Sequence, residues 1–471
     1  MSYKHIWDAQ FQDIRFREKT PTIPSDGRNP FENDYGRLIS SAPIRRLQDK
    51  TQVFPLEQSD YIRTRLTHSL EVSYIASSIG QSIENYLIDN KEISLNKKGY
   101  LSSLLRVSGL IHDLGNPPFG HFGEEAVKKF FKDYFISKEF KDYELKIKEH
   151  NNANNLILSE LEKADFVNFD GNVQTLRILS KLNYFGDAFG YNLTYSTLAS
   201  IIKYPSNSIE GNKGKNNSEI SKRKFGYFVT EKEIFETINN YLNLNNRRSP
   251  VVYLMEAADD IAYSAADIED GIKLNIVNIY EVKKIFEKEL TTNKNLVINE
   301  IDRLIKLFEN DVIDESIVIQ KFRIFTQRLM ISSIIDAFKN NYESIMNGRL
   351  ESEIIDVSDA SDIRNAYKKL QIKVFDDKNI VKKEIAGWEA IYGLLKIMVK
   401  ASRSINFKSV GNTYEARIYK LISSNHRYVY ENIEKYDNTE YTKLQMITDF
   451  ISGMTDTYAI NLYQELKGIK L

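Results

Sequence analysis

Residues 101–126 read LSSLLRVSGLIHDLGNPPFGHFGEEA, and this stretch decides how the rest of the chain is interpreted. From Tyr100 to Leu114 the apolar residues recur at helical spacing, on the face that also carries His112. Gly115 and the two prolines after it are typical of a helix end. The sequence therefore predicts a buried helix that ends on the adjacent pair His112 and Asp113.

A second predicted helix runs from Thr64 to about Asn90 and also turns a histidine inward. Its buried face is formed by residues at i+3 and i+4 spacing, namely His68, Val72, Ile75 and Ile79. A single inward histidine is most often a hydrogen-bonded core residue. Because the chain has only six histidines, two helices that each turn one inward favour a functional site over a structural role.

A third predicted helix begins at Ser249 and Pro250, with serine as its cap and proline in its first turn. Small alanines in the string PVVYLMEAADDIAYSAADIEDGI allow close packing beside a stripe of polar residues: Glu256, Asp259, Tyr263, Asp267 and Asp270. An uncompensated buried ion costs several kcal/mol. A bound cation explains this stripe, with Asp259 as one of its ligands.

Histidine and aspartate are the natural ligands of a divalent metal ion in a chain that has no cysteine. The three helices together predict one such site, held by His68, His112, Asp113 and Asp259. The absence of cysteine also excludes disulfides, thiolate zinc sites and a cysteine nucleophile. The combination of three helices is far more specific than any one of these residues.

The composition is that of an ordinary globular protein, with 471 residues, 42% hydrophobic and 27% charged, and a formal net charge of -1. Without a basic excess, nucleic acid is not an obvious main partner. No segment approaches the roughly 20 apolar residues of a membrane helix. We therefore expect a soluble, cytoplasmic protein with no membrane partner.

The fold class is predicted to be mainly α. Prolines and glycines crowd residues 1–60, which we expect to be an arm of short helices, whereas the last proline is Pro250 and periodic apolar residues continue to the end of the chain. The stretch Ser206 to Lys224 has almost no apolar residues and is expected to be a long mobile loop. Its basic end could reach a phosphate.

The metal-ligand residues resemble the H…HD…D signature of the HD superfamily. Longer strings resemble the bacterial dGTPase family from near one end of the chain to the other: NPFENDYGRLISSAPIRRLQDKTQVFPLE at 29–57, RTRLTHSLEV at 63–72, HDLGNPPFGHFGEEA at 112–126, MEAADDIAYSAADIED at 255–270 and DFISGMTDTYA at 449–459. The resemblance implies three regions: an arm contributing to the site (1–60), an HD phosphohydrolase core (61–275) and a C-terminal helical region (276–471).

The same resemblance implies a reaction, the hydrolysis of a deoxynucleoside triphosphate to deoxynucleoside and inorganic triphosphate. It implies one divalent metal ion per chain, Mn²⁺ or Mg²⁺, and a homo-hexamer. Some relatives respond to nucleotide effectors or single-stranded DNA, and the basic run from Lys213 to Lys224 offers contacts for either. The preferred base, the metal and the effector are not set by the sequence.

His121 and Glu124 are the predicted catalytic pair. His121 follows Pro117, Pro118 and Gly120 on a turn, and its ordinary pKa near 6.5 suits proton transfer. Glu124 lies three residues on, where one helical face would bring it to the imidazole. The resemblance supports this assignment, because the matching histidine and glutamate are catalytic in the family.

Phosphate binding requires cations, and the candidates are Arg65, which shares a helical face with His68, together with Lys203 and Lys224. The segment Lys203-Tyr204-Pro205 resembles a family segment, so Tyr204 is included in the predicted substrate site. For the nucleoside the resemblance implies Gln52 near the base, Asn116 near the metal, Asn172, and Tyr263 with Asp267 near the sugar. The family more often has Glu and Ala where this chain has Asp170 and Val173.

Two other readings remain open. A different HD enzyme, a phosphodiesterase, would use the same ligands, although His5, His150 and His426 lie in no convincing second-metal segment. A non-catalytic sensor of nucleotides or single-stranded nucleic acid would keep the fold without turnover. His121 and Glu124 argue against that loss of catalysis.

Overall fold

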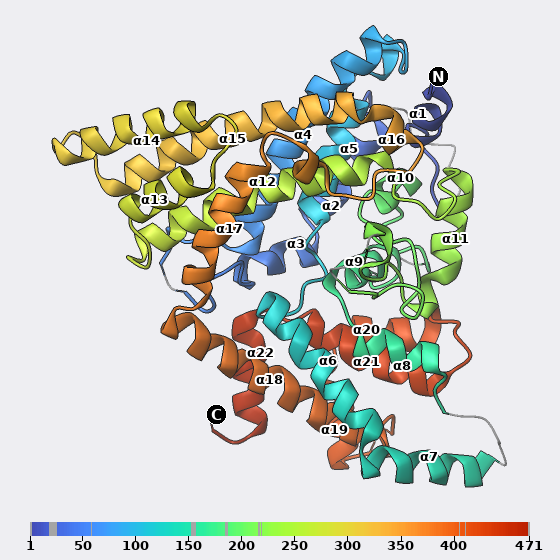
Figure 1. Cartoon of the computed structure of the whole chain (residues 1–471). Helices are drawn as coiled ribbons and strands as arrows, with labels where there is room; N and C mark the ends of the chain where they lie inside the picture. The colour runs from blue at the N-terminus through green and yellow to red at the C-terminus, as the bar shows by residue number, and fades with distance from the viewer. Residues whose placement is uncertain are drawn as a thin grey trace.

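The structure is a computed structural model that describes residues 2–17, 26–57, 59–151, 157–183, 187–214, 217, 219–404, 406–409 and 411–469. Within these ranges the chain is helical, and the strand-type pairing is limited to an isolated antiparallel bridge between Thr51 and Thr64. Figure 1 shows that the helices cross one another in several directions rather than lying parallel. The mainly α fold class is confirmed. None of the described helices is long and apolar enough to span a membrane.

The N-terminal arm carries three short helices, α1 (Lys4–Gln10), α2 (Pro30–Ile39) and α3 (Ala42–Arg46). Proline occupies the first turn of α2 and of α3, where its missing N–H costs nothing. Asn29 caps α2 by accepting from the backbone of Phe31 and Glu32. Trp7 and Phe31 are fully buried in the larger core, so the arm packs against the body of the protein.

Three long helices form the centre of the molecule: α4 (Arg65–Asp89), α5 (Tyr100–Ile111) and α12 (Pro250–Lys273). Each packs against the other two. Gly109 on α5 makes the closest approach possible, because a Cβ there would lie 2.7 Å from Cα of Ser73 on α4. The predicted cap Ser249 accepts a backbone N–H at the start of α12, and Thr64 does the same at the start of α4.

The remaining helices divide between two hydrophobic cores. In the larger core α12 packs against α15 (Glu315–Asn340) and α17 (Ser361–Phe375), whereas in the second core α18 (Lys378–Ser402) packs against α6 (Gly120–Ile136). Figure 1 shows this second group below the first. The other helices are α7 (Lys138–Asn151), α8 (Glu160–Val167), α9 (Gly171–Ser180), α10 (Tyr195–Ala199), α11 (Lys232–Tyr241), α13 (Ile279–Glu289), α14 (Lys294–Glu309), α16 (Tyr342–Met346), α19 (Tyr414–Leu421), α20 (Ser424–Tyr428), α21 (Thr439–Ser452) and α22 (Asp456–Leu466).

Short turns complete the secondary structure: the 3₁₀ turns η1 (Leu47–Asp49), η2 (Leu95–Lys97), η3 (Ile220–Lys222), η4 (Val229–Glu231) and η5 (Ile354–Val357), and the π turn η6 (Val429–Ile433). Residues after 276 contribute to both cores. The region boundaries at 60 and 275 stay predictions.

The stretch from Ser206 to Lys224 holds a single 3₁₀ turn among its described residues, in keeping with a predicted loop. It is nonetheless folded back on itself, because Lys213 N–H donates to the carbonyl of Lys222 at 2.9 Å. Ile220 is buried, and its N–H donates to Glu351 at 3.0 Å. One isolated apolar residue in a polar stretch therefore anchors part of this loop.

A buried ion cluster joins α9 to the C-terminal helices. Arg177 on α9 is 3% exposed and bonds three carboxylates: Asp449 at 2.8 Å, Glu231 at 2.8 Å and Glu434 at 3.2 Å. Lys181 is the second cation of the cluster, 3.2 Å from Glu434. A buried charge that loses its partner is expensive, so the cluster depends on Arg177.

Replacing Arg177 with Met is expected to lower the free energy of unfolding by about 3–5 kcal/mol, because buried Asp449 then loses its cation and Glu231 and Glu434 are left with Lys181 alone. Thermal unfolding monitored by circular dichroism measures the change. The matched control is Arg303→Met on α14, where the arginine is 56% exposed and pairs with Glu300. That control should leave the melting temperature nearly unchanged. Equal melting temperatures for the two variants would contradict the role of the cluster.

Candidate active site

Two histidines and an aspartate meet where the three central helices touch. His68 comes from the first turn of α4, His112 from the C-cap of α5 and Asp259 from the middle of α12. Their ligating atoms all lie within 4.8 Å of one another. Asp259 Oδ1 is 3.1 Å from His68 Nε2 and 3.4 Å from His112 Nε2. The structure thus brings together residues that are 191 positions apart in the sequence.

The orientation of His112 leaves one ring nitrogen available to a ligand. Its Nδ1 lies 2.7 Å from the carbonyl oxygen of Gly109, so Nδ1 carries the proton and donates. The other nitrogen, Nε2, is buried and has no hydrogen-bond partner. A buried acceptor without a partner costs about 1–3 kcal/mol. A cation beside Asp259 would satisfy this atom, so the residues fit a metal ion.

Asp113 adjoins this group of three. Its Oδ1 is 3.6 Å from His112 Nε2, and its other oxygen accepts a hydrogen bond from Arg65. Burial opposes ionisation of Asp113 and Asp259, but the neighbouring histidines, with Arg65 beside Asp113, hold the pKa of both carboxyls well below the usual range. Both aspartates therefore present negative charge to the site at neutral pH.

Arg65 is buried, and the structure assigns its guanidinium to Asp113. Gly120 lets it reach there, because this glycine has φ +56° and a Cβ on it would lie 2.5 Å from Arg65 Nη2. Any other residue would be strained in that conformation and would also collide with the arginine.

The predicted catalytic pair lies on the first turn of α6. His121 Nδ1 is 3.1 Å from Glu124 Oε2, and the imidazole is 83% exposed whereas the Glu124 side chain is 3% exposed. The second oxygen of Glu124 accepts the backbone N–H of Gly171 at 2.8 Å. The charge of Glu124 raises the pKa of His121, so the imidazole stays protonated to higher pH than a free histidine.

Gly171 at the start of α9 has no room for a side chain. A Cβ there would lie 2.2 Å from Asn116 Oδ1 and 2.9 Å from Glu124 Oε1. Replacing Gly171 with Ala should therefore displace Glu124, and we expect turnover to fall at least about tenfold with metal content unchanged. Steady-state kinetics and metal analysis of the same preparation measure both quantities. In the control Gly411→Ala, the nearest atom would be Ser409 Oγ at 3.5 Å, so full activity is expected.

Two lysines predicted to bind phosphate face the site with different partners. Lys203 makes no ion pair with any described residue, and Glu256 is paired with Arg248 instead. Burial lowers the pKa of Lys203, but the charges of Glu256 and Asp259 raise it by more, so the net shift is upward. Lys224 pairs with Asp170, and it also feels the charge of Glu124. Tyr204 follows Lys203 and is largely buried, which raises its pKa. Of the three predicted phosphate-binding cations, all of them described, Lys203 is the one without a carboxylate in ion-pair distance and can meet an anionic substrate.

The residues predicted to contact the base and the metal ion differ in their surroundings. Gln52 has a buried carbonyl oxygen, Oε1, without a hydrogen-bond partner. Asn116 is buried at the loop after the metal ligands, with its Oδ1 against Gly171. Asn172 is half-buried, and its Nδ2 donates to Asp170 Oδ1 at 2.7 Å.

The two residues predicted near the sugar lie on α12 and hold other partners. Tyr263 is one turn from Asp259, and its hydroxyl donates to Asp260 Oδ1 at 2.6 Å. Asp267 is buried two turns from Asp259, about 12 Å along the helix axis. Its Oδ2 accepts from Gln371 Nε2 at 2.8 Å, and burial raises its pKa to about 8. Asp267 is thus mostly a neutral acid at pH 7, bonded away from the metal-ligand group.

Arg248 is a residue of the site that the sequence reasoning missed. It is buried beside Tyr253, donates through Nε to the carbonyl of Lys203 at 3.0 Å and forms an ion pair with Glu256. This arrangement fixes the backbone of Lys203 and neutralises Glu256, the carboxylate with the largest effect on the pKa of Lys203. Its position directly before the helix start at Ser249 gave no distinctive pattern.

Lys50 was also missed. It is 3% exposed, and its ammonium donates to the carbonyl oxygens of Asn116 at 2.6 Å and Ser452 at 3.0 Å. Burial lowers its pKa to about 7. Lys50 therefore ties the arm to the loop that carries the metal ligands and to the end of α21.

Comparison with known proteins now places this site in a family. The HD domain matches residues 65–188, and the phosphohydrolase-associated domain matches residues 411–465. The deoxyguanosinetriphosphate triphosphohydrolase-like protein of Listeria innocua serovar 6a is 39% identical over 98% of this chain and 99% of its own. The chain belongs to the deoxyguanosinetriphosphate triphosphohydrolase family of HD proteins.

Other relatives agree with this family membership. The like-named protein of Synechocystis sp. is 31% identical over 100% of this chain and 99% of its own, and the deoxyguanosinetriphosphate triphosphohydrolase of Yersinia enterocolitica is 31% identical over 93% of each. The predicted family is confirmed. An HD domain binds a divalent metal ion, which agrees with the compact group of His68, His112 and Asp259.

Proposed function

We propose that this protein hydrolyses deoxynucleoside triphosphates, dGTP among them, to deoxynucleoside and inorganic triphosphate. The observation that carries the proposal is the buried His112 Nε2 without a partner, aimed at Asp259 and His68 within reach of an unpaired lysine. The names of the relatives support the same activity.

We assign one divalent metal ion, Mn²⁺ or Mg²⁺, to His68, His112, Asp113 and Asp259. When bound, such an ion supplies Lewis-acid polarisation of a phosphate oxygen and lowers the pKa of water. Arg65 acts through Asp113, because its guanidinium is already paired with that carboxylate. Lys203, Tyr204 and Lys224 are assigned to the phosphates of the substrate.

The reaction replaces the bond between the sugar oxygen and the α-phosphorus by a bond from water to that phosphorus. His121 is assigned as the general acid, which gives its Nε2 proton to the departing sugar oxygen while Nδ1 faces Glu124. Glu124 favours the protonated imidazole, and the N–H of Gly171 holds Glu124 in place. The products are a deoxynucleoside and triphosphate.

The nucleoside contacts are proposed at Gln52, Asn116, Asn172, Tyr263 and Asp267. A tyrosine against the deoxyribose excludes a 2′-hydroxyl by steric conflict. We further propose a homo-hexamer in the cytoplasm and a response to a nucleotide or to single-stranded DNA.

Ion-exchange chromatography of the products tests this function. The enzyme with Mn²⁺ or Mg²⁺ is incubated with each dNTP singly and with all four mixed, and we expect deoxynucleoside and triphosphate. Release of pyrophosphate or orthophosphate would contradict the reaction. Metal analysis is expected to give one ion per chain, and two ions would favour a binuclear phosphodiesterase.

A further inference from the structure

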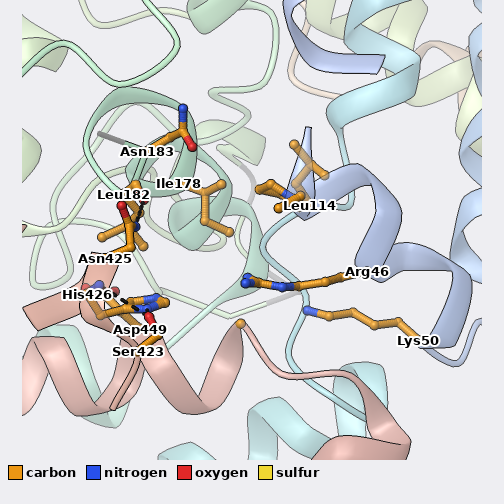
Figure 2. A pocket seen from close by; sticks show the side chains of 13 residues that line it. Arg46, Lys50, Leu114, Ile178, Leu182, Asn183, Ser423, Asn425, His426 and Asp449 are labelled. Carbon is orange, nitrogen blue, oxygen red and sulfur yellow. Dashed lines mark hydrogen bonds between the residues drawn. The ribbon is translucent and has the colours of Figure 1, made fainter. Parts of the chain in front are cut away.

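A pocket lies behind the loop that carries the metal ligands, because Leu114 of that loop lines it. It has a volume of about 250 Å³ and is formed by the arm from Ala42 to Lys50, the end of α9, the start of α20 and the end of α21. Figure 2 shows Arg46 and Lys50 extending side by side from the arm toward His426 and Ser423. We name it the Arg46 pocket.

Arg46 has no partner for its charge. It makes no hydrogen bond or ion pair with any described residue, yet it is only partly exposed and burial lowers its pKa. The positive charge of the neighbouring Arg45 lowers the pKa of Arg46 further. A cation withdrawn from water without a counter-ion is unfavourable, which points to an anion in the pocket.

Lys50 adds a second donor. An ammonium group has three N–H donors, and two of them are used by the carbonyls of Asn116 and Ser452. The third remains for the pocket that Lys50 lines. Neither carbonyl carries a formal charge, but burial lowers the pKa of Lys50 to about 7, so Arg46 supplies the main positive charge on this side of the pocket and Lys50 mainly a hydrogen-bond donor.

The opposite wall does not cancel that charge. The carboxylate of Asp449 is paired with Arg177 and accepts from Gln174 Nε2 at 3.0 Å. Burial lowers the pKa of His426 to about 4, so its imidazole is neutral at physiological pH. The remaining lining includes apolar side chains: Ala42, Pro43, Leu114, Ile178 and Leu182.

We propose that the Arg46 pocket binds a phosphate-bearing small molecule, with its phosphoryl group on Arg46 and Lys50 and the rest against Ile178 and Leu182. Guanidinium binds phosphate by two parallel hydrogen bonds, and a nearby ammonium suits the additional oxygens. The ligand would touch the catalytic loop from behind, because Leu114 follows the metal ligand Asp113 and Lys50 holds the Asn116 carbonyl.

Isothermal titration of the Mn²⁺-loaded full chain tests the pocket. The Lys203→Ala variant is used as background to weaken anion binding at the catalytic site. The probes are inorganic phosphate, inorganic triphosphate and deoxyguanosine 5′-monophosphate. We expect one binding event in this background, weakened at least tenfold by Arg46→Gln and unchanged by Arg45→Gln, which alters the exposed neighbour on α3.

The probes also separate the sources of the phosphate. If inorganic triphosphate alone binds, the ligand resembles the inorganic product of the reaction. If deoxyguanosine 5′-monophosphate binds more tightly than inorganic phosphate, the apolar wall contributes to binding. Ala42→Phe should block either ligand by filling the pocket while Arg46 remains. The proposal would be overturned if all probes still bound to both the Arg46→Gln and the Ala42→Phe variants. It would also be overturned if no probe bound to the folded background protein. Melting temperatures establish that each variant is folded.

Discussion

His112→Ala is expected to remove the metal ion and at least about a thousandfold of turnover in the same step. The side chain offers its only free nitrogen to the site, and that nitrogen lies 3.4 Å from Asp259 Oδ1. The loss corresponds to about 4 kcal/mol of transition-state stabilisation, within the several kcal/mol that a bound metal contributes. Elemental analysis after dialysis and product assays on the same sample measure both effects.

The folded state needs a separate control in this experiment, because His112 is also buried. His5→Ala provides the matched histidine change, since His5 is exposed on α1 and far from the ligands in sequence. It should keep both metal and turnover. If His112→Ala kept one ion per chain while its activity fell, His112 would act by another route and the ligand assignment would be wrong.

The three helices that build this site were predictable because each has strong local signals at its ends. Thr64 and Ser249 cap their helices, and Gly115 with the following prolines ends the third. The apolar faces then dictate which side chains turn inward. His68, His112 and Asp259 could therefore be placed together from sequence, because residues on the packed faces of contacting helices must meet.

Pairings between distant polar residues could not be predicted in the same way. Nothing local distinguishes Arg248, which neutralises Glu256 and holds the Lys203 carbonyl, from a solvent-exposed arginine. The sequence around Lys50 likewise gives no sign that this lysine is buried, although it is one of the most buried described lysines. Charge pairing depends on side-chain direction and tertiary approach, and neither has a periodicity that a sequence displays.

Some predicted substrate residues illustrate the same limit. Asp267 belongs to the polar stripe of α12, but the helix turns it toward Gln371 and burial keeps it mostly protonated. Asn172 donates its backbone N–H and its Nδ2 to Asp170, the N-cap of α9. Their assignment to the nucleoside stays a prediction. It requires that these side chains exchange their present hydrogen-bond partners for the substrate.

The pH dependence of turnover distinguishes the role of His121 from a structural one. A general acid works in its protonated form, so activity is lost as pH rises through its pKa. Glu124 raises that pKa. Glu124→Gln removes the negative charge, the pKa of His121 falls, and the alkaline limb of the profile moves to lower pH. The control Glu125→Gln changes a carboxylate that is 57% exposed and paired with Lys128, and it should leave the limb in place.

His121→Ala completes the test, because it removes the acid without touching a metal ligand. We expect turnover to fall by about 10²–10⁴ with one ion per chain retained, and the alkaline limb due to His121 to disappear. The imidazole is 83% exposed, so little packing is lost and the melting temperature should hardly change. An unchanged alkaline limb in this variant would assign the proton transfer to another group. The positioning of Glu124 by Gly171 would then serve the fold rather than the reaction.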